Sequence, residues 1–244
     1  MPGTSWHDAY TSDLQSLYGL LVVPLAFLAY RLAAPMEARR AVDPASARFV
    51  SGLTLIFAVL TMVDPIATGP LVRSEALAGG SLARAIPIFF VILGDLRVLW
   101  LALGVARPER RPSANLVLAV GASLIVPVAS GLVYLGLGLV VPALDEHAIW
   151  MIYELFFLAL CVHAGRRLVA RSLGDAPARA SYLRALFGYS AAYYALWLTA
   201  DLLIVVGGLD LGWAIRMVPN QLYYGFWVVF AYTRFFCVRP SKAA

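Results

Sequence analysis

The stretch that decides the fold spans residues 84–106 and reads RAIPIFFVILGDLRVLWLALGVA. After Arg84, its only charged residues are Asp95 and Arg97, close to its centre. At a rise of about 1.5 Å per residue, an α-helix of this length crosses a bilayer core of about 30 Å. The stretch therefore predicts a membrane-spanning helix that carries two charges inside the membrane.

Apolar segments of the same kind recur along the whole chain. Hydrophobic residues make up 61% of its 244 residues, and the mean hydropathy of +0.79 is far above that of a soluble domain. Without water in the membrane core, each segment must be helical to satisfy its own backbone. The sequence therefore predicts an all-α polytopic membrane protein, with residues 1–244 forming one seven-helix transmembrane domain. The expected transmembrane helices are 14–34, 49–71, 84–106, 114–141, 147–169, 182–207 and 213–236.

The basic residues predict the orientation of this bundle, because Lys and Arg are retained on the cytoplasmic side of a membrane. The basic residues on one side of the pattern are Arg31, Arg39, Arg40, Arg48, Arg107, Arg110, Arg111, Arg166, Arg167, Arg171, Arg179, Arg184, Arg234, Arg239 and Lys242. The other side has only Arg73, Arg84 and Arg216. We therefore expect the N-terminus outside and the C-terminus in the cytoplasm.

The preference for Arg over Lys is typical of a GC-rich bacterial genome, and we expect the plasma membrane of a bacterium. The first fifteen residues contain no Lys or Arg, so they do not resemble a cleaved signal peptide. The net charge of +5 is explained by cytoplasmic loops beside anionic lipid, so the expected partner is the bilayer and not nucleic acid. Cys161 and Cys237 fall at inner helix ends, where we expect no disulfide.

Several classes of site lack their residues. The chain has no Cys-x-x-Cys, His-Glu-x-x-His or Gly-x-Ser-x-Gly motif. Its three histidines are scattered over both sides of the pattern. We therefore expect no metal site, no cofactor, and neither zinc hydrolase nor serine hydrolase chemistry.

A shift of 132 residues indicates an internal duplication. Arg84-x-x-Pro87 then matches Arg216-x-x-Pro219. A 3+1+3 arrangement of two parallel halves would follow, as in transporters whose site lies between repeats. The alternative is that Arg and Pro gather at helix ends in any case. The two halves would be 14–106 and 147–240, joined by the helix 114–141.

Four acids inside the predicted spans are the first candidates for a functional site: Asp64, Asp95, Glu154 and Asp201. A charge in hydrocarbon costs several kcal/mol on insertion scales, roughly 3 at a helix centre, so such residues usually face a cavity or a partner. Asp64 and Asp201 have an alternative interpretation as interfacial residues. Pro65, Gly69 and Pro70 follow Asp64, and we expect the helix to unwind there.

Asp95 lies close to the membrane midplane. Arg97 follows two residues later, about 200° around the helix, so the two side chains do not share a face. Each must find a partner on another helix or in water. Asp95 is interpreted either as half of a buried interhelical ion pair or as a protonatable site. Glu154, flanked by aromatic residues, suits a proton carrier or an acid kept neutral merely to be tolerated.

Aromatic residues accompany these charges at helical spacing. Tyr189, Tyr193, Trp197 and Asp201 are each four residues apart, so they lie on one helix face. The next span carries Arg216, Asn220, Tyr224 and Trp227, and Trp150 lies one turn before Glu154. These residues predict an aromatic-walled vestibule suited to planar or cationic ligands, or else ordinary interfacial and core packing.

The helix predicted over 114–141 differs from the others. It carries several Gly and Ser residues, a single proline at Pro127, and no charged residue. Small residues permit close helix packing and Pro127 predicts a bend, so we interpret this segment as a packing or hinge helix.

The leading functional hypothesis is a transporter or permease for a small molecule, with proton coupling through the buried carboxylates. An alternative is a membrane-embedded enzyme that acts on a lipid or isoprenoid through paired acids, although no motif supports an enzyme. A ligand sensor is the second alternative. It is not a covalent retinal opsin, because Lys242, the only lysine, lies in the tail.

Overall fold

The computed structural model describes residues 5–34, 41–141, 144–145 and 147–237. It is all-helical, at 83% helix, with no strand in the described part. Six helices are long and apolar enough to cross a membrane. They are Leu14–Ala33, Ala47–Leu71, Ser81–Ala106, Pro112–Val140, Ala148–Ser172 and Pro177–Val206. The expected positions of Arg39, Arg40, Arg239 and Lys242 lie outside the described residues.

Several of these helices combine α-helical and π-helical segments. In chain order the elements are α1 (Trp6–Thr11), η1 (Leu14–Tyr18), α2 (Gly19–Ala33), α3 (Ala47–Ile66), η3 (Ala67–Leu71), α4 (Ser81–Ala106), α5 (Pro112–Ser123), α6 (Ile125–Val140), α7 (Ala148–His163), η4 (Ala164–Leu168), α8 (Val169–Ser172), α9 (Pro177–Asp201), η5 (Leu202–Val206), α10 (Leu211–Asn220), η6 (Gln221–Phe226) and α11 (Trp227–Phe236).

The last segment is helical from Leu211 to Phe236, because α10, η6 and α11 follow one another without a gap. It packs within the bundle, with α10 against α9 and α11 against α3. It is not among the six apolar helices, since it carries Arg216, Asn220 and Gln221 together with several tyrosines.

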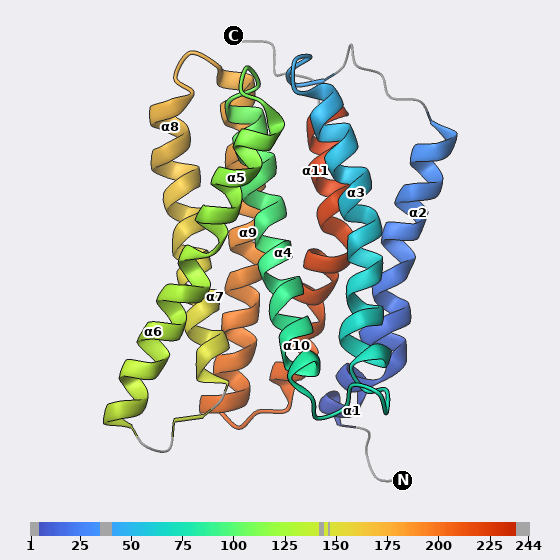
Figure 1. The fold of residues 1–244 in the computed structure, drawn as a ribbon, viewed down its shortest axis with the longest axis vertical. Coiled ribbons are helices and arrows are strands. Elements are labelled where there is room, and N and C mark those ends of the chain that lie inside the picture. Colours follow the sequence, from blue (N-terminus) through green and yellow to red (C-terminus); the bar gives the residue numbers. More distant parts are fainter. Residues whose placement is uncertain (1–4, 35–40, 142–143, 146, 238–244) are drawn as a thin grey trace.

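The helices run alternately up and down the bundle (Figure 1). One end holds α1, the α3–α4 connection and the α9–α10 connection, and we call it the α1 end. The opposite end holds the α4–α5 and α8–α9 connections and the end of α11. We call it the arginine-rich end, because Arg107, Arg110, Arg111 and Arg171 lie there.

The expected unwinding after Asp64 is wrong. The chain stays helical through Pro65 and continues as the π-helix η3, which contains Pro70. π-Helical turns re-satisfy backbone groups around prolines inside a membrane, so the helix adapts there without breaking. The Thr68 hydroxyl also donates to the Asp64 carbonyl at 2.9 Å.

In the fourth span, where a bend is expected at Pro127, the helix is interrupted at Leu124, between α5 and α6. Pro127 lacks an N–H group and cannot bond the carbonyl four residues earlier, at Ser123. Of the small residues expected to permit close packing, Ser123 and Ser130 are buried, but the glycines make no close contact. A Cβ added at Gly121, Gly131 or Gly136 would meet no atom within 4 Å.

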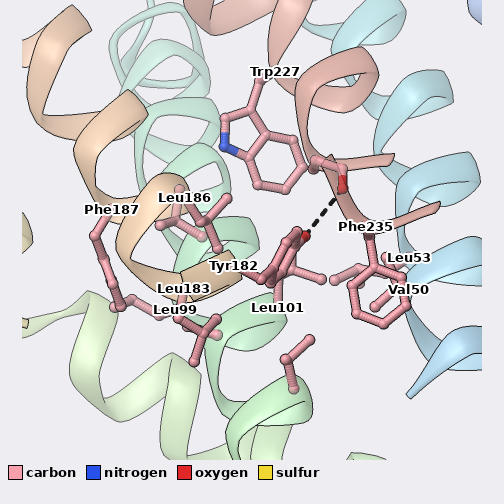
Figure 2. Close-up of a cluster of buried hydrophobic side chains, with 14 of the residues drawn as sticks. Val50, Leu53, Leu99, Leu101, Tyr182, Leu183, Leu186, Phe187, Trp227 and Phe235 are labelled. Carbon is pink, nitrogen blue, oxygen red and sulfur yellow. Dashed lines mark hydrogen bonds between the residues drawn. The ribbon is translucent and has the colours of Figure 1, made fainter. Parts of the chain in front are cut away.

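The hydrophobic core lies in the half of the bundle nearer the arginine-rich end. Figure 2 shows side chains of α9, α4, α3 and α11 meeting there, with Tyr182 among them. The Tyr182 hydroxyl donates to the Ala231 carbonyl at 3.1 Å, so this buried polar group is satisfied. Trp227, Leu101 and Phe235 are fully buried in the same cluster. The buried acids Asp64, Glu154 and Asp201 lie in the other half.

Candidate functional site

A cavity of about 230 Å³ opens between the helices at the α1 end, and we call it the vestibule. Five parts of the chain contribute to its wall: α1, α4, α7, α9 and the α10–η6 segment. The lining residues are Tyr10, Pro87, Val91, Trp150, Tyr153, Glu154, Tyr194, Trp197, Arg216, Asn220, Tyr223 and Tyr224.

An ion pair joins two helices at the edge of the vestibule. The Arg216 guanidinium on α10 contacts the carboxylate of Asp201, which is fully buried at the end of α9. One turn along, the Trp197 indole N–H donates to the Asn220 side-chain oxygen at 2.8 Å. Four residues predicted from helical spacing therefore hold α9 and α10 together.

The short helix α1 lies against the mouth of the vestibule. The Asp210 carboxylate accepts hydrogen bonds from the backbone N–H groups of Trp6, at 2.7 Å, and His7, at 3.2 Å. The Tyr10 hydroxyl then accepts from Arg216 Nε at 3.2 Å and from Asn220 Nδ2 at 3.3 Å. These contacts fix α1 on α10 and place a tyrosine over the cavity.

Glu154 is the charged group of the vestibule that lacks an ion-pair partner. Its side chain is 4% exposed and lines the cavity from α7. Within the described residues, its Oε2 atom has no hydrogen-bond partner. A buried carboxyl group without a partner is costly, so a ligand or a proton is needed to compensate it.

Asp95 lies deeper in the bundle and is fully buried. Its two carboxylate oxygens each accept a tyrosine hydroxyl, Oδ2 from Tyr153 on α7 and Oδ1 from Tyr194 on α9. Both tyrosines also line the vestibule. The cluster of Asp95, Tyr153 and Tyr194 therefore joins the cavity floor to the centre of α4.

Arg97 points to the opposite side of α4, as its spacing from Asp95 predicts. It donates to the Tyr223 carbonyl at 2.7 Å and to the Thr61 hydroxyl at 3.4 Å. Its guanidinium carbon lies 4.2 Å from the centre of the Tyr223 ring and 4.6 Å from that of Trp227. Asp95 and Arg97 thus each find partners on other helices. Within the described residues, the partners of Asp95 are two tyrosine hydroxyls, so its interpretation as half of an interhelical ion pair is not supported.

Asp64 is 5% exposed and faces a narrow cleft that Arg97 and Tyr223 also line. The cleft has a volume of about 10 Å³, room for about one water molecule. The closest donor to the Asp64 carboxylate is the Thr68 hydroxyl, at 3.4 Å. Asp64 and Asp201 both lie just before a π-helical segment, yet only Asp201 pairs with an arginine.

The structure brings together only part of the predicted site. The predicted residues that line the vestibule are Trp150, Glu154, Trp197, Arg216, Asn220 and Tyr224. Tyr189 of α9 lies outside the vestibule, and its ring stacks on that of Phe230 with 4.2 Å between the ring centres. Tyr193 is fully buried beside it. Asp64, Arg97 and Trp227 belong to the separate contact of α3, α4 and η6 with α11.

Sequence reasoning missed Tyr10, Tyr153, Tyr194 and Tyr223. For Tyr10 the sequence did hold a signal, because Ser5-x-x-Asp8 is a capping-box pattern that begins a helix. The structure has both hydrogen bonds of this capping box, and Tyr10 lies in the helix that follows, α1. The other three are tyrosines in apolar spans, and spacing within one helix does not show which neighbouring helix they face.

A second cavity, of about 630 Å³, lies toward the arginine-rich end between α4, the α5–α6 bend, α7 and α9. Of the described residues that line it, only Arg107 and Ser172 are polar. Asp64, Asp95, Glu154 and Asp201 are not among the residues that line it. We call it the apolar cavity, and its composition suits a hydrocarbon chain.

Within the described ranges, no group of three or more His, Cys, Asp and Glu residues is placed to hold a metal ion. Cys161 is buried in α7 and Cys237 is exposed after α11. Comparison of the chain with protein families, curated proteins and solved structures gave no match. The arrangement of side chains is therefore the basis of any functional conclusion.

Proposed function

We propose that the protein is a seven-helix integral membrane protein of the bacterial plasma membrane that transports a small molecule. The seventh transmembrane helix is Leu211–Phe236, which at about 1.5 Å per residue is long enough for a core of about 30 Å. Arg216, Asn220, Tyr223 and Tyr224 of this helix line the vestibule, which explains part of its low hydropathy.

The arginine-rich end is cytoplasmic in this proposal, with the N-terminus and the vestibule outside. The support is the gathering of Arg107, Arg110, Arg111 and Arg171 at one end of the bundle. A 3+1+3 arrangement of the helices is part of the proposal. It draws support from the similar positions of Asp64 and Asp201 before π-helical segments.

One observation carries the transport proposal: the vestibule is connected to mid-bundle by buried titratable groups. Glu154 lies in its wall, and Tyr153 and Tyr194 reach from the same wall to Asp95. Buried acids of this kind mark substrate and proton pathways in membrane proteins. A solute bound at the vestibule and a proton held on these carboxyl groups would then be coupled.

The test is flux through proteoliposomes that contain an entrapped pH-sensitive dye. Radiolabelled choline, glycine, glucose and lactate serve as cationic, zwitterionic, neutral and anionic probes. We expect at least one probe to enter faster than into protein-free liposomes, with a change in the dye signal. Transport would be ruled out if no probe moved.

The role of the acids is tested with Asp95→Asn and Glu154→Gln in the same assay. Both substitutions preserve side-chain size and remove the charge. We expect them to abolish the dye signal, and Glu109→Gln in an exposed loop is the matched control. Wild-type flux in both variants would show that these acids do not serve transport.

The apolar cavity favours a second candidate, a protein that acts on a lipid or isoprenoid. Its volume of about 630 Å³ lies within the range of small-molecule sites, about 300–1,000 Å³. Paired acids would have to supply the chemistry, yet Arg107 is its only charged lining residue. Lipid retained in the apolar cavity, together with turnover of that lipid, would support this candidate over transport.

A further inference from the structure

The charges of the vestibule do not balance. Arg216 is neutralised by Asp201, which contacts its guanidinium and is fully buried. Glu154 remains, 96% of its side chain removed from solvent and its Oε2 atom without a hydrogen-bond partner in the described chain. An ionised Glu154 therefore leaves the vestibule with one uncompensated negative charge.

The walls around this charge are mostly aromatic. The rings belong to Tyr10, Trp150, Tyr153, Tyr194, Trp197, Tyr223 and Tyr224. The face of an aromatic ring attracts cations, and cages of such rings recognise quaternary ammonium groups. Desolvation strengthens this attraction. Aromatic rings and an unpaired acid therefore favour the same charge on a ligand.

The dimensions of the vestibule set the size of this ligand. Its volume of about 230 Å³ lies below the range of about 300–1,000 Å³ that holds drug-sized molecules. Pro87 and Val91 of α4 supply apolar contacts, which suit alkyl groups on a nitrogen. The ligand must be compact and partly apolar.

We propose that the vestibule binds a compact organic ammonium ion whose nitrogen lies against Glu154, and that this cation displaces a proton from Glu154. This inference rests on the proposed function and names its substrate class. In the exchange the ammonium ion enters, the Glu154 O–H bond breaks, and the proton passes to water. Charge is conserved, so binding one cation releases up to one proton.

Although α6 also packs against α7, it has no residue in the described lining of the vestibule. Other ionisable groups line the vestibule with Glu154 or adjoin it. They are Arg216 and Asp201 from α10 and α9, Tyr10 from α1, Tyr194 from α9, Tyr223 and Tyr224 from η6, and Tyr153 beside it on α7, with Asp95 of α4 behind the last. Arg216 has Asp201 as its ion-pair partner. Asp95 already accepts two hydroxyl groups. Glu154 is therefore the group that exchanges the proton.

The test is isothermal titration calorimetry of the purified protein in mild detergent. The probe is choline, and the control ligand is 3,3-dimethyl-1-butanol, which has the same shape without the charge. We expect choline to bind at least tenfold more tightly. Its affinity should fall as pH falls, by up to about tenfold for each pH unit, because proton and cation compete. Equal affinity for the two ligands, or no binding of choline, would overturn the proposal.

Two variants separate the site from the fold. Glu154→Gln should lower choline affinity at least tenfold and remove both proton release and pH dependence. Trp150→Leu should weaken choline several-fold and keep the pH dependence, because Glu154 remains. Thermal unfolding of both variants shows that they are folded. Unchanged choline affinity in a folded Glu154→Gln variant would contradict the proposal.

Failure of this inference can be told apart from failure of the transport proposal. If choline binds as expected but does not cross the proteoliposome membrane, the ammonium site stands and transport is wrong. If glucose or lactate is transported while choline neither binds nor moves, transport stands and the ammonium ligand is wrong.

Discussion

Two neighbouring tyrosines of α9 allow the contribution of a buried hydrogen bond to the free energy of unfolding to be measured. Tyr193 and Tyr194 are both almost fully buried, but of these two residues only Tyr194 donates its hydroxyl to Asp95. Within the described residues, the Tyr193 hydroxyl has no hydrogen-bond partner. The two hydroxyl groups therefore differ in the hydrogen bond to Asp95, while the rings pack against different neighbours.

We expect Tyr194→Phe to destabilise the protein by about 1–2 kcal/mol, because a hydrogen bond to a carboxylate is lost and Asp95 is left under-satisfied. Tyr193→Phe, the matched control, should leave stability unchanged or raise it. Thermal unfolding in mild detergent measures both. Equal losses in the two variants would show that ring packing, and not the bond to Asp95, sets the cost.

Arg97 supports a second prediction at this scale. Its planar group stacks between Tyr223 and Trp227 while it donates to the Tyr223 carbonyl. Lysine cannot reproduce this combination, so Arg97→Lys should cost about 1–2 kcal/mol, the worth of a desolvated cation–π contact. Arg84→Lys, in an exposed part of the same helix, is the control. If the two variants unfolded at the same temperature, the stacking would be unimportant for stability.

Among the helices, the contact of α4 with η6 depends on a glycine. A Cβ added at Gly94 would collide with the Tyr223 side chain, whereas one added at Gly188 of α9 would meet nothing within 4 Å. Gly94→Ala should therefore destabilise the protein by about 1–3 kcal/mol through overpacking.

Gly188→Ala provides the matched substitution in a helix interior. Alanine is the better helix former by about 1 kcal/mol, so this variant should be as stable as the wild type or more so. Chemical or thermal unfolding of the two variants decides the matter. Equal destabilisation would mean that α4 and η6 are not in close contact.

Hydropathy predicted helices well because a bilayer leaves the backbone no alternative and fixes the length. It did not predict that the helix with Pro65 and Pro70 would adapt through π-helical turns. The apolar pattern of a segment is the same whether its carbonyls bond four or five residues ahead. Nor did it reveal α1, which is too short to carry a hydropathy signal.

The candidate site was predictable where its residues share one helix face. Trp197, Arg216 and Asn220 were found by spacing, and they lie together at the vestibule. Tyr153 and Tyr194 were not found, because their role depends on how α7 and α9 are rotated toward Asp95. That rotation is set by packing between helices and not by the pattern of any one of them.

For the whole molecule, the proposed orientation is tested with cysteines and a membrane-impermeant maleimide. Cys237 is exposed after α11 at the arginine-rich end, and Cys161 is buried. We expect Cys237 to react only after cells are permeabilised, since that end is cytoplasmic in our proposal. An Ala76→Cys substitution, in the exposed α3–α4 connection, should react in intact cells. The reverse labelling pattern would show that the bundle has the opposite orientation in the membrane.

The position of α1 across the vestibule bears on residence time. Tyr10 lines the vestibule and accepts hydrogen bonds from Arg216 and Asn220, so we expect it to hinder the entry and exit of a bound solute. A barrier of this kind slows entry and exit together, so it sets rates and leaves the equilibrium constant almost unchanged. In Tyr10→Phe, stopped-flow tryptophan fluorescence should show both rate constants for choline rising by a similar factor. Helix α1 would then set the residence time of the bound solute and contribute little to its affinity.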